Sequence, residues 1–200
     1  MTSFTIFGTG NMANAIGDVL AAGGASVAHI AHSDASAGSS AGASVGGDIV
    51  ILAVPYPAIA EIVASHGDQL ANKTIVDITN PLNFDTFDEL VVPAGSSAAA
   101  ELQRALPNSR VLKAFNTNFA ATLASGKVGQ GSEAATTVLV AGDDADAKAA
   151  LAAAVTAGGL AAVDAGSLKR ATELEAIGFL QLTLAASEKI SWTGGFALNN

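Results

Sequence analysis

Short apolar runs alternate with amphipathic stretches along most of the chain, as expected when strands and helices take turns. Runs rich in Val, Ile, Leu or Phe have the length of buried strands, at 4–7, 26–31, 48–54, 74–79, 110–115, 136–141 and 160–163. Apolar residues at helical spacing lie between them, and predict helices at 11–20, 57–64, 96–106, 143–157 and 168–190. This order predicts an α/β fold with right-handed crossovers and a doubly wound, mainly parallel sheet.

The segment 33–47 interrupts this order, because it is almost pure Ser, Ala and Gly and has no apolar period. A helix and a further strand are usual at that point of such a fold, and the segment is too short for both. We expect a loop there, with a single helical turn as the alternative, so the fold is shortened after its second strand. Residues 1–200 are interpreted as one domain, in which 168–200 form a C-terminal helix and tail.

The turn after the first strand carries a G-x-G-x-x-A motif. Gly8 permits a tight turn, Gly10 lets the backbone approach a pyrophosphate, and Ala13 keeps the helix close to the strand. The helix start then points N–H groups at the phosphates. Its position between strand and helix favours a Rossmann NAD(P)-binding fold over a purely structural turn. The predicted phosphate ligands are Gly8, Thr9, Gly10, Asn11 and Met12.

The end of the second strand bears on the choice of dinucleotide. A carboxylate there holds the ribose diol of NAD, whereas hydrogen-bond donors accommodate the 2′-phosphate of NADP. Here His32 and Ser33 come first and Asp34 follows. We expect NADPH to be favoured, with NAD possible; the alternatives are that Asp34 reaches the ribose or that His32 is an ordinary loop residue.

Three further strand ends predict a rim around the nicotinamide, because ligands of open α/β sheets bind beyond the carboxyl ends of the strands. Prolines stiffen two of these loops, and uncharged amides suit a carboxamide or a planar heterocycle. Each loop alone is equally typical of a simple turn. The predicted rim residues are Ala53, Val54, Pro55, Tyr56, Asn80, Pro81, Leu82 and Asn116.

Composition narrows the classes of partner. The net charge of −9 argues against nucleic acid and anionic membranes, whose phosphates would repel the chain. The absence of cysteine excludes disulfides, thiolate catalysis and cysteine-based metal sites. Apolar residues make up 50% of the chain, but no run approaches the roughly 20 residues of a membrane span. Without a basic leader at its start, the chain is expected in the cytoplasm.

No catalytic acid or base is predicted. His29 lies within a strand, and His66 follows a helix in a polar stretch that predicts a solvated position. Asp77 in its apolar strand is interpreted as structural. The acids at the start of the helix 143–157 are expected to cap it rather than to bind metal: Asp143, Asp144 and Asp146. Hydride transfer between two redox rings fits such a site, because it needs stacking and distance more than proton transfer.

Several motifs together resemble the NADP-dependent oxidoreductases of the coenzyme F420 reductase type: IFGTGNM at 6–12, VDITNPL at 76–82, KAFNT at 113–117, VAGDD at 140–144 and DAGSL at 164–168. The cytosolic domains of ferric reductases and the N-terminal domain of pyrroline-5-carboxylate reductase share the architecture. The resemblance implies phosphates on Gly8 to Met12, a 2′-phosphate near His32 and Ser33, and the nicotinamide beside Ala53 to Tyr56 and Asn80 to Leu82. The family often has Ser-Arg where this chain has His32-Ser33, and its insert after the second strand is longer.

The predicted function is therefore an NAD(P)-dependent oxidoreductase that transfers hydride between NADPH and a second cofactor or small acceptor such as F420 or a flavin. The alternative is a non-catalytic dinucleotide sensor or regulatory module.

A homodimer is also predicted, because the second half of the helix 168–190 is apolar on most faces and must be buried on several sides. The alternative is that the tail alone folds back over this helix. In the dimer, Trp192 or Phe196 of the tail would line the acceptor site.

Overall fold

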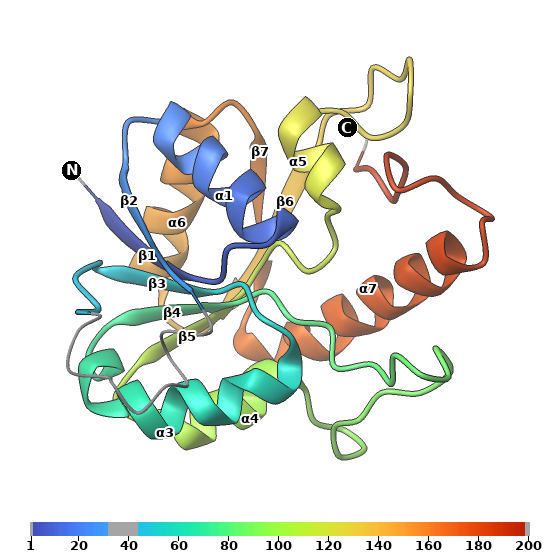
Figure 1. Ribbon diagram of the computed structural model, residues 1–200. Coiled ribbons are helices and arrows are strands. Elements are labelled where there is room, and N and C mark those ends of the chain that lie inside the picture. Colours follow the sequence, from blue (N-terminus) through green and yellow to red (C-terminus); the bar gives the residue numbers. More distant parts are fainter. Residues whose placement is uncertain (1, 32–43, 199–200) are drawn as a thin grey trace.

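A computed structural model of the chain describes residues 2–31 and 44–198 (Figure 1). Its strands are β1 (Ser3–Phe7), β2 (Ser26–Ile30), β3 (Ile49–Leu52), β4 (Thr74–Asp77), β5 (Arg110–Lys113), β6 (Thr137–Gly142) and β7 (Ala161–Gly166). Its helices are α1 (Asn11–Ala22), α3 (Ile59–Leu70), α4 (Ala98–Ala105), α5 (Ala120–Ser125), α6 (Ala145–Ala157) and α7 (Ala171–Ala186), with 3₁₀ turns η1 (Tyr56–Ala58) and η2 (Leu168–Arg170). The strands and all but one of the helices lie where the apolar pattern predicts them.

The seven strands form one sheet in the order β2-β1-β3-β4-β5-β6-β7. From β2 to β5, neighbouring strands are parallel. The chain moves outward from β1 to β2 and then returns to the other side of β1 as β3, so the strand order reverses between β1 and β3. In doubly wound sheets the crevice at such a reversal holds the ligand. The predicted fold class is confirmed.

The sixth strand departs from the regular crossovers expected for a parallel sheet, because β6 runs antiparallel to β5. The connection at 114–136 stays at the edge of the sheet where β5 ends, and antiparallel neighbours need no crossover. It contains α5, a six-residue helix that the apolar pattern does not predict. This connection therefore places an extra layer of side chains beside the carboxyl ends of β1 to β5.

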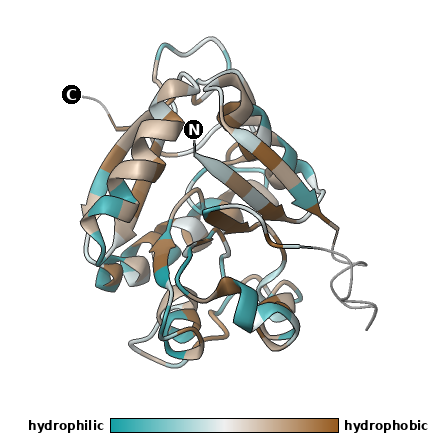
Figure 2. Cartoon of the chain, turned by 90° about the vertical axis from the view of Figure 1, so that its left-hand side faces the viewer, coloured by the Kyte–Doolittle hydropathy of each residue, from teal (hydrophilic) through white to brown (hydrophobic). Residues whose placement is uncertain are grey.

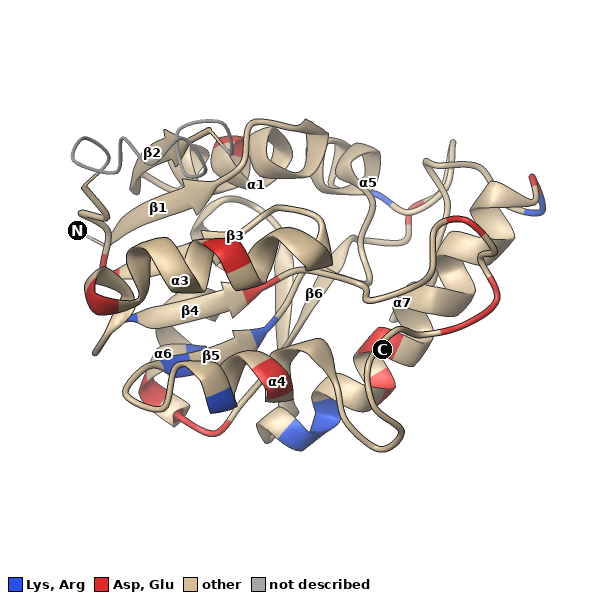
Figure 3. Cartoon of the chain, turned by 60° about the horizontal axis from the view of Figure 1, so that its bottom comes forward, with Lys and Arg blue, Asp and Glu red and all other residues tan. Residues whose placement is uncertain are grey.

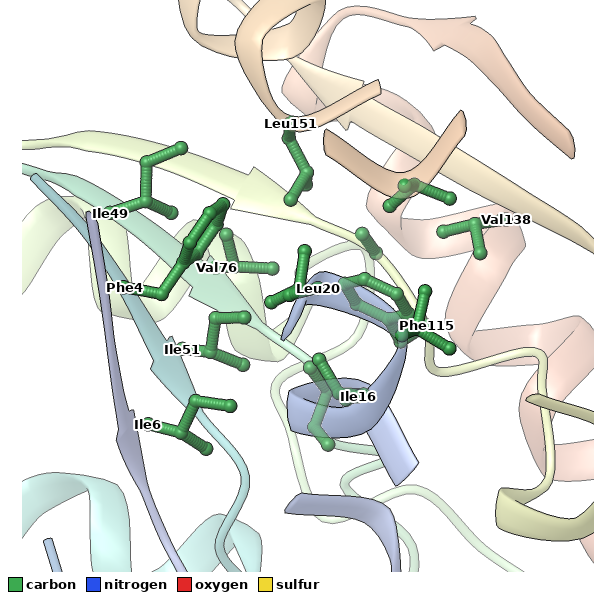
Figure 4. Close-up of a cluster of buried hydrophobic side chains, with 14 of the residues drawn as sticks. Phe4, Ile6, Ile16, Leu20, Ile49, Ile51, Val76, Phe115, Val138 and Leu151 are labelled. Carbon is green, nitrogen blue, oxygen red and sulfur yellow. The ribbon is translucent and has the colours of Figure 1, made fainter. Parts of the chain in front are cut away.

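Helices cover both faces of the sheet, with α1, α5 and α6 on one side and α3 and α4 on the other (Figure 1). Strongly hydrophobic segments of the strands lie between these layers (Figure 2). On the α1 side, Ile16 and Leu20 pack with Phe4, Ile51 and other strand residues (Figure 4). Both residues are fully buried, so the helix that opens at the glycine-rich turn is fixed rigidly on the sheet.

Helix α7 leaves the body of the sheet and passes its carboxyl edge, followed by the tail (Figure 1). The tail folds back in part: Gly129 N–H donates to the Thr193 carbonyl at 2.7 Å, and Phe196 N–H to Gln181 Oε1 at 3.1 Å. Leu180 and Phe196 nevertheless remain about half exposed. None of the described helices is long and apolar enough to cross a membrane.

Candidate functional site

The glycine-rich turn is built where β1, β2 and β3 meet. Gly8 has a φ of +125°, and a Cβ on it would lie 2.3 Å from the Ala53 carbonyl oxygen, so only glycine fits. Its N–H donates to the Ile30 carbonyl at 2.8 Å. Gly10 is different, because a Cβ on it would meet no atom within 4 Å. The first glycine is therefore required by the protein itself, whereas the second leaves open space in front of the backbone.

The start of α1 at this turn is suited to an anion. Gly10 is its N-cap and supplies no side-chain cap, and its first turn holds no acidic residue. The first N–H groups of a helix lack partners within the helix and carry a partial positive charge. In Figure 3 the ribbon is coloured as acidic elsewhere on the molecule, whereas the first turn of α1 holds no acidic residue. A chain with a net charge of −9 can bind phosphates here through its backbone.

A first pocket of about 350 Å³ opens in front of the turn. It is lined by five of the eight predicted rim residues, Ala53, Val54, Pro55, Tyr56 and Asn80. The other lining residues are Gly10, Asn11, Met12, Ala13, Ile78, Thr79, Phe84 and Leu182. The Thr79 hydroxyl is buried and has no hydrogen-bond partner among the described residues. Pro81 and Leu82, also predicted for the rim, are buried and line neither this pocket nor its neighbour.

A second pocket of about 380 Å³ adjoins the first. The two share Asn11, Met12, Ile78, Asn80 and Leu182, so they adjoin and have one wall in common. The remaining lining comes from the connection at 114–136 and from the tail: Phe115, Asn116, Asn118, Phe119, Ala120, Ala121 and Trp192. The ring centroids of Phe119 and Trp192 lie 4.9 Å apart. None of the residues that line this second pocket is ionisable.

Asn80 and Asn116 brace the wall between the pockets. Asn80 Nδ2 donates to the Asn116 carbonyl at 2.8 Å, and Asn116 Nδ2 donates to Asn80 Oδ1 at 2.9 Å and to the Leu174 carbonyl at 2.8 Å. Helix α7 comes so close that a Cβ on Gly178 would lie 2.2 Å from Asn80 Oδ1. The two amides therefore fix the ends of β4 and β5 against α7.

A buried ion cluster lies directly behind this wall. Lys113 Nζ lies 2.9 Å from Asp77 Oδ2 and 2.8 Å from Glu175 Oε1, and the three side chains are at most 1% exposed. Glu175 also accepts from the N–H of Ala98 at 3.0 Å, at the start of α4. The cluster joins β4, β5, α4 and α7, and confirms that Asp77 is structural. No pattern in the sequence predicts the roles of Lys113 and Glu175.

Two pKa shifts follow from this environment. Burial raises the pKa of Glu175 above the usual range of a glutamate, against the opposing effect of Lys113. Burial also raises the pKa of the Tyr56 phenol, and the carboxylate of Glu101 acts in the same direction. The phenol that faces the first pocket is therefore neutral at physiological pH.

The structure agrees with some of the remaining predictions and corrects others. His32 and Ser33, expected at the 2′-phosphate, lie outside the described residues. His66 was expected in solvent, but it is 1% exposed and packs edge-on against Phe7, because α3 continues past the predicted end at 64 and carries it into the core. Asp144 caps α6 by accepting from Ala147 N–H at 2.8 Å, as predicted. Within residues 2–31 and 44–198, no cluster of His, Asp and Glu could hold a metal.

Comparisons with known proteins agree with this geometry. A sequence profile of the family described as "NADP oxidoreductase coenzyme F420-dependent" matches residues 3–81. The F420-dependent NADP reductase of Methanocaldococcus jannaschii is 30% identical over 152 residues, which are 74% of this chain and 66% of that protein. The chain thus spans just under two thirds of the length of this curated relative.

Solved structures show the same fold. A candidate F420-dependent NADP-reductase from Arthrobacter sp. FB24 superposes with a TM-score of 0.79, at 23% identity and with 100% of each chain covered. A pyrroline-5-carboxylate reductase from Coxiella burnetii gives a TM-score of 0.56 at 16% identity, covering 94% of this chain and 70% of that one. By its profile match and the curated relative, the chain is similar to the coenzyme F420-dependent NADP oxidoreductase family, and the solved structures show the same fold.

Proposed function

We propose that the protein is an NADPH-dependent oxidoreductase that transfers hydride between the nicotinamide and a second planar redox ring, with F420 as the favoured partner. The observation that carries this proposal is the pair of adjoining pockets with one common wall, of which the first opens on the glycine-rich turn. Direct hydride transfer requires the two reacting carbons to lie about 3–3.5 Å apart, so the two rings would stack where the pockets meet. The family, and the reductase activity named for the archaeal relative, support F420.

The residues of the first pocket fit a nicotinamide dinucleotide. The space in front of Gly10 suits a pyrophosphate, and the N–H groups at the start of α1 would hold it. The unpartnered hydroxyl of Thr79 offers a hydrogen bond to the carboxamide. Ala53, Val54 and Pro55 supply an apolar surface for the nicotinamide face.

In this reaction the protein would orient the two rings and exclude water from them, rather than supply an acid or a base. Bound NADPH supplies the hydride. Met12 and Leu182 line both pockets and would pack beside both rings. Phe119 and Trp192 give the second ring an aromatic surface to pack on. Since no ionisable side chain lines the second pocket, a proton that the acceptor takes up comes from solvent at the pocket mouth.

Hydride transfer with a panel of acceptors tests the proposal. The purified protein is mixed with NADPH under anaerobic conditions with F420, a free flavin or a cyclic imine, and oxidation of NADPH is followed by its absorbance. We expect turnover with F420 to exceed that with the other acceptors. Tight NADPH binding without turnover on any acceptor would favour the alternative of a dinucleotide sensor.

We also propose that the protein is a homodimer formed through α7 and the tail. The support is the set of apolar side chains that stay about half exposed after the tail has folded back: Leu180, Trp192, Phe196 and Leu198. Since Trp192 lines the second pocket, the partner subunit would cover part of the acceptor site. Sedimentation at micromolar concentration tests this proposal, and a monomer of 19.7 kDa would contradict it.

A further inference from the structure

The imidazole of His29 touches the glycine-rich turn directly. Its Nδ1 lies 3.0 Å from the carbonyl oxygen of Gly8. A carbonyl only accepts, so Nδ1 carries a proton and donates it to this bond. The peptide between Gly8 and Thr9 is planar and trans, and its N–H therefore points away from His29. By holding the carbonyl, the imidazole fixes the direction of the first N–H group of the turn.

The same ring is held from a second side by α1. A Cβ on Gly17 would lie 2.8 Å from His29 Nε2, so the imidazole lies against the helix at the one point where the missing side chain makes room for it. On the sheet, His29 is paired with Ile6 of β1. The ring is thus fixed between the turn and the helix that together form the phosphate site, although it belongs to neither.

His29 is the one group beside the turn, among the described side chains that bond to it, that can become positively charged. Two described side chains hydrogen-bond to carbonyls of the turn, His29 to Gly8 and Asn14 to Thr9, and only the imidazole can become a cation. Strand β1 and the rest of β2 hold no charged residue. In α1 the only charged residue is Asp18, which lines a groove with residues of α5 rather than the turn. Imidazole is the side chain that changes charge between about pH 5 and 8.

We propose that His29 is a positioning residue of the dinucleotide site that makes cofactor affinity depend on pH. When Nε2 gains a proton, the bond from Nδ1 to Gly8 is kept and a positive charge forms near Gly17, between one and two turns of α1 from the proposed pyrophosphate site. Affinity then rises as the pH falls. This inference rests on the proposed function, because it requires the pyrophosphate to lie on the turn.

Dissociation constants measured at about pH 6 and about pH 8 test the inference. NADH is the probe, because it lacks the 2′-phosphate, which titrates in the same range. The wild-type protein is expected to bind NADH about two- to tenfold more tightly at the lower pH, the effect of one partly solvated charge near a pyrophosphate. The ratio of the two constants is the quantity compared between variants.

Two substitutions separate positioning from charge. His29→Asn places an amide nitrogen near the position of Nδ1, so it keeps the bond to Gly8 but cannot become charged. We expect wild-type affinity at about pH 8 and no tightening at about pH 6. His29→Leu removes both effects, and we expect weaker binding at both pH values. Circular dichroism confirms that each variant is folded.

The outcomes distinguish this inference from the proposed function. If His29→Asn kept the wild-type pH dependence, the charge would come from elsewhere and the inference would be wrong. If His29→Leu bound NADH as tightly as the wild type at about pH 8, His29 would not position the turn. If the wild type bound neither NADH nor NADPH, the proposed function itself would fail. If the wild type bound NADH equally tightly at both pH values, only the role of His29 would be overturned.

Discussion

The two adjoining pockets take most of their lining from different parts of the chain. The pocket on the glycine-rich turn is lined mainly by segments that directly follow β1, β3 and β4. Apart from the five residues that it shares with the first, the second pocket is lined by the connection at 114–136 and by the tail. The first lining follows directly from where the strands end, whereas the second needs segments that are distant in the sequence to be held together.

The largest expected effect concerns the buried cluster behind the second pocket. Lys113→Met leaves Asp77 and Glu175 buried without their cation, and should lower the free energy of unfolding by about 3–5 kcal/mol. Urea denaturation measures this change. The matched control is Lys127→Met, whose partner Glu133 is 97% exposed, and which should cost at most about 1 kcal/mol. Equal losses in the two variants would mean that the cluster does not hold the acceptor side together.

The next effect concerns the backbone of the cofactor pocket. Gly10→Val fills the open space in front of the turn, and should weaken NADPH binding by about 100-fold or more, or about 2.7 kcal/mol. Calorimetry measures it. Gly67→Val is the control, because Gly67 also faces open space but lies on α3, away from the turn. Unchanged affinity in Gly10→Val would place the phosphate site elsewhere.

A smaller effect should separate the two pockets. Trp192→Ala removes one aromatic wall of the second pocket, and should raise the KM for the acceptor by about tenfold while leaving the Kd for NADPH unchanged. Val163→Ala serves as the control, since Val163 is an exposed apolar residue of β7 that lines neither pocket. A parallel change in the affinity for NADPH would show that the pockets are not independent.

The smallest expected effect is the choice of dinucleotide. From His32 and Ser33 after the second strand, we expect NADPH to bind about fivefold more tightly than NADH, which corresponds to about 1 kcal/mol. Fluorescence titration with both dinucleotides measures the ratio. Tighter binding of NADH would indicate that Asp34 holds the ribose diol instead.

The sequence predicts the geometry of the glycine-rich turn well, because its signals are local. The motif Gly8–Ala13 follows a strand and opens a helix within a few residues, and that context defines its geometry. The apolar runs of the central strands are a local signal too, since β3 and β4 are buried on both faces and such a strand is apolar along most of its length.

The acceptor side is less predictable because its contacts are distant in the sequence. Glu175 accepts from the N–H of Ala98, 77 residues away, and no local pattern links them. Helix α5 has only six residues, too few for a recognisable period. The antiparallel direction of β6 is equally hidden, because an apolar run does not reveal which way its strand runs. The burial of His66 is also hard to predict. Its neighbours in the sequence are polar, but the face of α3 on which it lies packs into the core.

The fate of a labelled hydride tests the central claim most directly. NADPH that carries deuterium at the transferred position of its nicotinamide is mixed with F420 and the protein in ordinary water. The reduced product is then examined by mass spectrometry, because F420 as a deazaflavin accepts hydride on carbon. The geometry of two pockets with a common wall predicts that the deuterium appears in reduced F420, without exchange with solvent. Reduced F420 without deuterium, or no reduction at all, would contradict direct transfer between the two pockets.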